Sequence, residues 1–204
     1  ILISYFDMLK RIDFQNIDVK LSYVFMAIIF IIIIMLFAEN FIYSESVSFL
    51  NLRNTDDLAF HQSIRKAHLL IQNKEWGKLF VLNDYAYGWI YWFSISSITY
   101  PFYLLQTHFQ IDWLLIVMPR QISLLFGVMS LVILKKILEY RNIEKIYIMA
   151  SLLIFVLFPT FGYFSMRFGT VNPILFFSIL SFYYAQKKLT QRNIIYSLIA
   201  LAIA

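Results

Sequence analysis

The sequence contains no cysteine, and only 14% of its 204 residues are charged. The absence of cysteine excludes disulfides and metal sites with cysteine ligands. Hydrophobic residues make up 61% of the chain, a share well above the roughly 45 to 50% of soluble domains. The apolar runs do not alternate with polar residues, which excludes a porin-like barrel. We therefore expect an all-α, polytopic helical membrane protein.

Five apolar runs are interpreted as membrane spans, for which about 20 residues are needed. They cover residues 21–38, 113–134, 146–164, 168–185 and 194–204. The sequence begins at Ile1 without a methionine and stops at Ala204 inside the last run. We expect a single transmembrane domain over residues 1–204 that is incomplete at its C-terminus.

A further apolar segment, residues 88–105, decides the orientation of the later spans. If it crosses the membrane, seven basic residues of the later turns fall in short outer loops, against the preference of Lys and Arg for the cytoplasm. If it lies along the outer surface, 10 of the 17 basic residues are cytoplasmic. We prefer the second arrangement, which predicts a multi-pass protein of the cell membrane with a cytoplasmic N-terminus. The net charge of +5 then reflects orientation and not nucleic-acid binding.

The resulting outer loop, residues 39–112, contains an amphipathic stretch. Phe60, Ile64, Ala67 and Ile71 recur at helical spacing, while the polar residues Gln62, Arg65, Lys66 and Asn73 fall on the other side. This pattern predicts a helix lying flat on the membrane. Residues 88–105 mix Trp and Tyr with Ser, Thr and Pro and predict a second interfacial helix.

Two adjacent carboxylates, Asp56 and Asp57, follow Asn54 and Thr55 at the start of the amphipathic helix. In one interpretation the group caps the helix, because Asn or Thr accepts backbone N–H bonds and acids favour the positive helix end. In the other, one carboxylate faces a cavity at the membrane surface, where it takes a proton from an acceptor or holds a divalent cation. The sequence leaves both interpretations open.

Three segments together resemble a known family. They are the acidic pair after the first span, the segment 83–92 (NDYAYGWIYW) and the segment 119–127 (PRQISLLFG). Their order resembles the amino-terminal part of the C-type (GT-C) integral-membrane glycosyltransferases, near the protein O-mannosyltransferases and aminoarabinose transferases. The resemblance implies transfer of a sugar from a polyprenyl-phosphate donor to a protein, lipid or glycan acceptor on the outer face, with inversion at the sugar carbon.

The resemblance also implies roles for particular residues. Asp56 would be the catalytic carboxylate and Asp57 its acidic neighbour, while Arg167 matches an arginine before the family's second acidic position. Where relatives carry that second Asp, this chain has Asn172, which adds no negative charge. A divalent cation, Mg²⁺ or Mn²⁺ at Asp56, is therefore a weaker expectation than the carboxylate chemistry itself.

Other candidates rest on residue type and position. Arg120 and Arg167, near outer helix ends, are candidates for binding the donor phosphate, with snorkelling to head groups as the alternative. Tyr85, Tyr87 and Asn172 are candidates for binding the substrate. The two tyrosines belong to an aromatic run that can stack on a sugar, although Trp and Tyr are also typical of the membrane interface.

His61 and His68 lie seven residues apart and share a helix face, a wider spacing than metal pairs usually have. Two other function classes remain as alternatives, a transporter or flippase for a lipid-linked substrate and a non-catalytic membrane subunit of the same fold.

Overall fold

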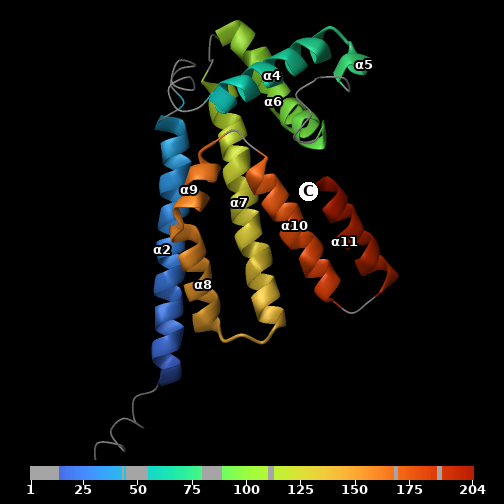
Figure 1. Ribbon diagram of the computed structural model, residues 1–204. Coiled ribbons are helices and arrows are strands. Elements are labelled where there is room, and N and C mark those ends of the chain that lie inside the picture. Colours follow the sequence, from blue (N-terminus) through green and yellow to red (C-terminus); the bar gives the residue numbers. More distant parts are fainter. Residues whose placement is uncertain are drawn as a thin grey trace, which may run out of the picture.

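The computed structural model describes residues 14–42, 44, 55–79, 89–109, 113–167, 170–187 and 190–204, without the side chains of 14–17, 55–57, 89–92 and 107–109. These residues form α-helices joined by short turns, and no strand occurs among them. The expectation of an all-α chain is confirmed for this part of the protein. Figure 1 shows a group of steep helices with a smaller group lying across one end.

The two longest helices are α2 (Phe14–Ile42, 29 residues) and α7 (Leu114–Tyr140, 27 residues). At 1.5 Å per residue they reach about 40 Å, more than the roughly 30 Å of a hydrocarbon layer. Among the described residues these two helices are each long and apolar enough to cross a membrane. Large apolar side chains on the outside of α2, such as Phe30 with 62% exposure, are compatible with a lipid environment.

The run at residues 146–164 was expected to be one span, but the structure divides it. Helix α8 (Lys145–Leu157) and helix α9 (Pro159–Ser165) meet at an angle of 62°. Between them Phe158 is extended, with φ −65° and ψ 125°. The ring of Pro159 disfavours a helical conformation at the preceding residue, and proline has no N–H to continue the hydrogen-bond ladder. The run is therefore two helices joined by a bend, and its crossing of the membrane as one span stays a prediction.

Helices α10 (Val171–Gln186) and α11 (Gln191–Ile203) form a hairpin beside α7 (Figure 1). Their 16 and 13 residues reach about 24 and 20 Å, less than the hydrocarbon thickness. In the described part of the chain, up to three spans meet the criteria of length and composition if the bent pair counts as one. The five expected spans thus remain a prediction.

Helices α4 (Thr55–Gln72), α5 (Trp76–Leu79) and α6 (Trp89–Phe109) lie together across one end of the bundle, here called the α4/α6 end (Figure 1). The amphipathic pattern of α4 is confirmed, because Ile64 and Ala67 are buried and Gln62 is exposed. Its buried face does not lie on an open membrane surface, however. Ile64 packs with Ile95 of α6 and Ile116 of α7, so protein covers this face.

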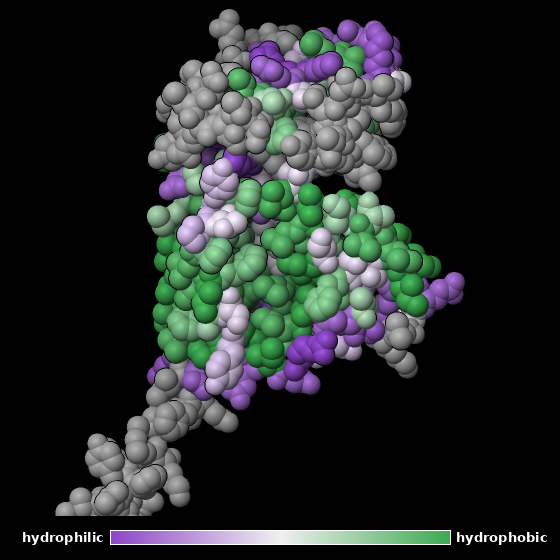
Figure 2. Space-filling model, viewed as in Figure 1, coloured by the Kyte–Doolittle hydropathy of each residue, from purple (hydrophilic) through white to green (hydrophobic). Residues whose placement is uncertain are grey.

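The main hydrophobic core lies where α2, α7, α8 and α9 meet. Its buried members are Leu36, Leu124, Leu131, Ile148, Met149, Leu152, Val156 and Phe161. Figure 2 shows a hydrophobic surface around the middle of the bundle, with hydrophilic residues gathered at both ends. The end opposite α4 and α6, where the α7–α8 and α10–α11 turns lie, is here called the turn end.

Candidate functional site

A cluster of polar side chains fills the α4/α6 end of the bundle, where α2, α7, α9 and α10 approach one another. Its members are Asn40, Ser44, Arg120, Gln121, Ser123, Ser165 and Asn172. All except Gln121 are buried. Because buried polar groups normally require hydrogen bonds, the bonds within this polar cluster determine how the four helices fit together.

Arg120 lies in the second turn of α7, and only 2% of its surface is exposed. Its Nη1 donates a hydrogen bond to Ser44 Oγ at 3.2 Å. The Ser44 hydroxyl donates in turn to the carbonyl oxygen of Asn40. Arg120 therefore does not snorkel toward head groups, since it is held inside the protein. Burying a charged side chain in a membrane bundle costs free energy, so a buried arginine is a candidate functional residue.

Asn40 joins α2 to two other helices. Its Nδ2 donates to the carbonyl oxygen of Ser165 at 3.2 Å and to Gln121 Oε1 at 3.4 Å, and Gln121 Nε2 donates to the carbonyl oxygen of Phe37 at 2.9 Å. The Asn40 Oδ1 atom is fully buried and accepts no hydrogen bond from the described residues. An unpaired buried oxygen costs about 1 to 3 kcal/mol.

Asn172 is the second residue of α10 and is 2% exposed. Its Nδ2 donates to the Ser123 carbonyl oxygen at 3.0 Å and to Ser165 Oγ at 3.2 Å. A Cβ at Gly127 would lie 3.2 Å from both Asn172 Nδ2 and Phe161 Cε2, so a glycine permits this close approach. Asn172, which we expected to contact substrate, thus uses its amide nitrogen to hold α10 against α7 and α9.

An apolar groove of about 450 Å³ lies between the α8–α9 bend and α10. Its walls are formed by Ser151, Ile154, Phe155, Phe158, Thr160, Phe161, Phe164, Val171, Asn172 and Leu175. Ile154 and Phe158 are 67% and 63% exposed, so the groove opens toward the outside of the bundle. Asn172 lines the groove and belongs to the polar cluster, so the groove and the cluster are in contact.

Arg167 follows α9, two residues after Ser165, and is partly exposed. Its Nη1 donates to the Tyr163 hydroxyl, and its guanidinium carbon lies 4.6 Å from the centre of the Tyr163 ring. Arg167 is partly exposed, whereas only 2% of the surface of Arg120 is exposed. Of the two predicted phosphate-binding arginines, Arg167 is therefore the more accessible.

The acidic pair Asp56 and Asp57 lies in the first turn of α4, and its side chains are outside the described residues. The next residue, Leu58, packs against the cluster of Ile64, Ile95 and Ile116, as does Ile122. Ile116 and Ile122 lie on either side of Arg120 in α7. Leu58, in the first turn of α4, therefore packs against the cluster to which α7 contributes Ile116, one helical turn before Arg120.

The interface between α4 and α6 contains a buried histidine. His68 Nε2 lies 2.8 Å from Thr99 Oγ1 and 3.1 Å from the Ser96 carbonyl oxygen, and its ring centre is 4.9 Å from that of Tyr103. Thr99 already donates to the carbonyl oxygen of Ile95, so His68 Nε2 is the donor toward it. Burial lowers the pKa of His68 from 6.5 to about 4, only partly opposed by the bond to Ser96. His68 is thus neutral near pH 7.

Several predicted site residues have no described side chain. Tyr85 and Tyr87 lie outside the described residues, and the capping and catalytic interpretations of Asp56 both stay predictions. Within the described ranges, no three His, Asp or Glu side chains are grouped so that they could hold a metal ion. Asp56 therefore stays the predicted ligand of a cation. Asn172 uses its amide nitrogen in a hydrogen bond within the protein.

Sequence reasoning did not identify the polar cluster as a unit. The predicted first span ends at residue 38, whereas α2 continues to Ile42 and Asn40 is buried. Gln121 and Ser123 were part of the segment used for the family resemblance, but no role was assigned to them. The sequence did contain a signal for this cluster. Asn40 follows the first apolar run, and Arg120 and Gln121 lie near the start of a later one.

The comparisons with known proteins found no match to any family model, curated protein or solved structure.

Proposed function

We propose that this chain is the amino-terminal part of a polytopic membrane glycosyltransferase that takes a sugar from a polyprenyl-phosphate donor. The observation that carries the proposal is the buried Arg120, one helical turn after Ile116. Leu58, the residue after the acidic pair, packs against the hydrophobic cluster that contains Ile116. In this proposal the α4/α6 end faces the outside of the cell. The site then lies at the membrane surface, where an amphipathic donor presents its phosphate and sugar.

The chemistry assigned to the chain is a single displacement. Asp56 takes the proton of the acceptor nucleophile as that atom attacks the anomeric carbon of the sugar. The bond from this carbon to the phosphate oxygen breaks as the new glycosidic bond forms. Negative charge then develops on the departing polyprenyl phosphate, and the guanidinium of Arg167 stabilises it.

Asp57 supports Asp56, and Arg120 fixes the surrounding frame through Ser44 and Asn40. The Asn40 amide nitrogen holds α2 against α9 through the Ser165 carbonyl oxygen. Such positioning contacts add to a general base, which by itself contributes about 10²- to 10⁴-fold to the rate.

The bent pair α8–α9 favours a second candidate function, a transporter or flippase for a lipid-linked substrate. Transporters commonly build their substrate sites where a membrane helix is interrupted. Here the interruption at Phe158 lies beside the groove that Asn172 helps to line. Against this candidate, Arg120 lies near the end of α7 and not at its middle, whereas transporter sites lie near the bilayer midplane.

The test is sugar transfer by full-length Asp56→Asn protein in membranes, with a radiolabelled polyprenyl-phosphate donor. Asn caps a helix about as well as Asp but lacks the charge that a base requires. We expect normal expression and a fall in transfer of roughly a hundredfold or more. Glu75→Gln is the matched control, because Glu75 forms a surface ion pair with Lys78 at 2.9 Å and has no assigned role.

Two outcomes would contradict the enzyme. Wild-type transfer by Asp56→Asn and by Asp57→Asn would remove the acidic pair from the chemistry. Movement of the donor between the two leaflets of proteoliposome membranes, without any transfer of sugar to an acceptor, would support the flippase function instead.

A further inference from the structure

The turn end of the bundle carries an excess of positive charge. Its described basic residues are Lys20, Lys135, Lys136, Arg141, Lys145, Lys187 and Arg192, against the acids Asp18, Glu139 and Glu144. Lys145 of α8 lies over Tyr23 of α2, and Arg141 Nε donates to Gln186 Oε1 at 2.8 Å, so these residues from distant segments share one level. Figure 2 shows hydrophilic residues along this edge of the hydrophobic surface.

Three of these seven cations, Lys145, Lys187 and Arg192, lie over tyrosine rings. Lys135 and Glu139 form an ion pair at 3.4 Å, and no other basic residue of the turn end has an ion pair with a described residue. Lys187 Nζ lies 4.2 Å from the centre of the Tyr183 ring, and the Arg192 guanidinium lies 5.2 Å from that of Tyr196. A tyrosine ring attracts a cation without neutralising it. The positive charge therefore stays available for an anion.

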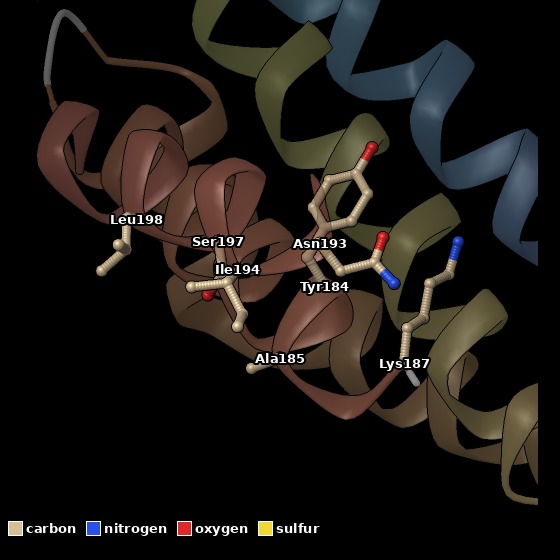
Figure 3. A pocket seen from close by; sticks show the side chains of 7 residues that line it. All are labelled: Tyr184, Ala185, Lys187, Asn193, Ile194, Ser197 and Leu198. Atoms are coloured by element: carbon tan, nitrogen blue, oxygen red, sulfur yellow. The ribbon is translucent and has the colours of Figure 1, made fainter. Parts of the chain in front are cut away.

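A cavity of about 200 Å³ lies where α10 ends and α11 begins. Figure 3 shows the polar ends of Tyr184, Asn193 and Lys187 on one side of the cavity. Ile194 and Leu198 lie on the other side and are 45% and 59% exposed. The cavity thus has a cationic, hydrogen-bonding end next to an apolar surface on the outside of the bundle.

We propose that this cavity binds the head group of an anionic phospholipid such as phosphatidylglycerol. The lipid phosphate contacts Lys187 and Asn193, and its acyl chain runs along Ile194 and Leu198. The cavity volume suits a phosphate with its glycerol, while the chain stays in the membrane. A zwitterionic lipid is disfavoured because its own ammonium approaches Lys187 and Arg192. Free phosphate lacks the chain that the apolar surface would contact.

This inference goes beyond the proposed function, because it involves neither the acidic pair nor sugar transfer. It assigns the turn end to the leaflet that is rich in anionic lipid, the location that the charge pattern of the chain also predicts. Bound lipid would hold the α10–α11 hairpin at a defined depth in the membrane.

The experiment is native mass spectrometry of the full-length protein in detergent, titrated with phosphatidylglycerol or phosphatidylcholine. We expect tighter binding of phosphatidylglycerol and a loss of roughly fivefold in affinity for Lys187→Gln, since one basic residue near an anionic surface contributes about that factor. Lys187→Arg should retain binding. Lys135→Gln is the matched control, because Lys135 lies at the same end but is paired with Glu139 and does not line the cavity.

Each contrary outcome overturns the assignment. Equal affinity for the two lipids would show that the head-group charge is not recognised. Unchanged phosphatidylglycerol binding by a Lys187→Gln protein with wild-type thermal stability would remove the cavity from the site. Displacement of the lipid by millimolar inorganic phosphate would make this a small-anion site.

Discussion

Protonation of His68 should loosen the packing of α4 on α6. The histidine is fully buried and neutral, and its pKa is lowered from 6.5 to about 4. When the two helices separate, the side chain returns to water and binds a proton more readily. The open state therefore takes up more protons between these pH values, and the free energy of opening falls as the pH falls.

The size of the effect follows from the two pKa values. Between the two pKa values, the free energy of opening falls by about 1.4 kcal/mol per pH unit. From pH 7.5 to 5.5, which includes the edge of this range, it falls by about 1.3 kcal/mol. Below about pH 4 the total approaches roughly 3.4 kcal/mol for a shift of this size. A change of 1.3 kcal/mol corresponds to about a tenfold larger open population.

Hydrogen exchange of the α4 amides measures this opening directly. After correction for the intrinsic exchange rate, we expect protection of residues 61–72 to fall about tenfold from pH 7.5 to 5.5. His68→Phe keeps an aromatic ring against Tyr103 and removes the titration, so its protection should lose this pH dependence. A wild-type protection factor that does not change with pH, or an unchanged dependence in His68→Phe, would refute the reasoning.

Two other predictions concern packing and orientation. Gly127→Leu should lower the melting temperature by several degrees, because its side chain meets Asn172 and Phe161, whereas Gly77→Leu should have little effect where nothing lies within 4 Å. Thermal unfolding of the two variants in the same detergent makes the comparison, and equal melting temperatures would contradict the close packing. A single cysteine at the exposed Gln62 should react with an impermeant thiol reagent outside intact cells, and one at Arg141 should not. Labelling of position 141 from outside would reverse the proposed orientation.

The sequence alone determined the features that depend on local pattern. Its apolar content and run lengths predicted the all-helical chain and the long helices α2 and α7. The spacing of Ile64 and Ala67 predicted the buried face of α4. These predictions succeed because the helix repeat places residues three or four apart on one side, so that hydropathy along the chain records which side is covered.

The tertiary structure decided which groups meet. The bond from Asn40 to Ser165 joins residues 125 positions apart, and Arg120 reaches Ser44 across 76 positions. Hydropathy along one helix does not specify the partner on another, so the burial of Arg120 and the covering of α4 by α6 were not predictable. Pro159 accounts for the break in the helix, and beyond the 62° bend α9 packs against α7, a contact that the sequence did not specify. Long-range contacts of this kind depend on how whole helices fit together, and no local pattern encodes that fit.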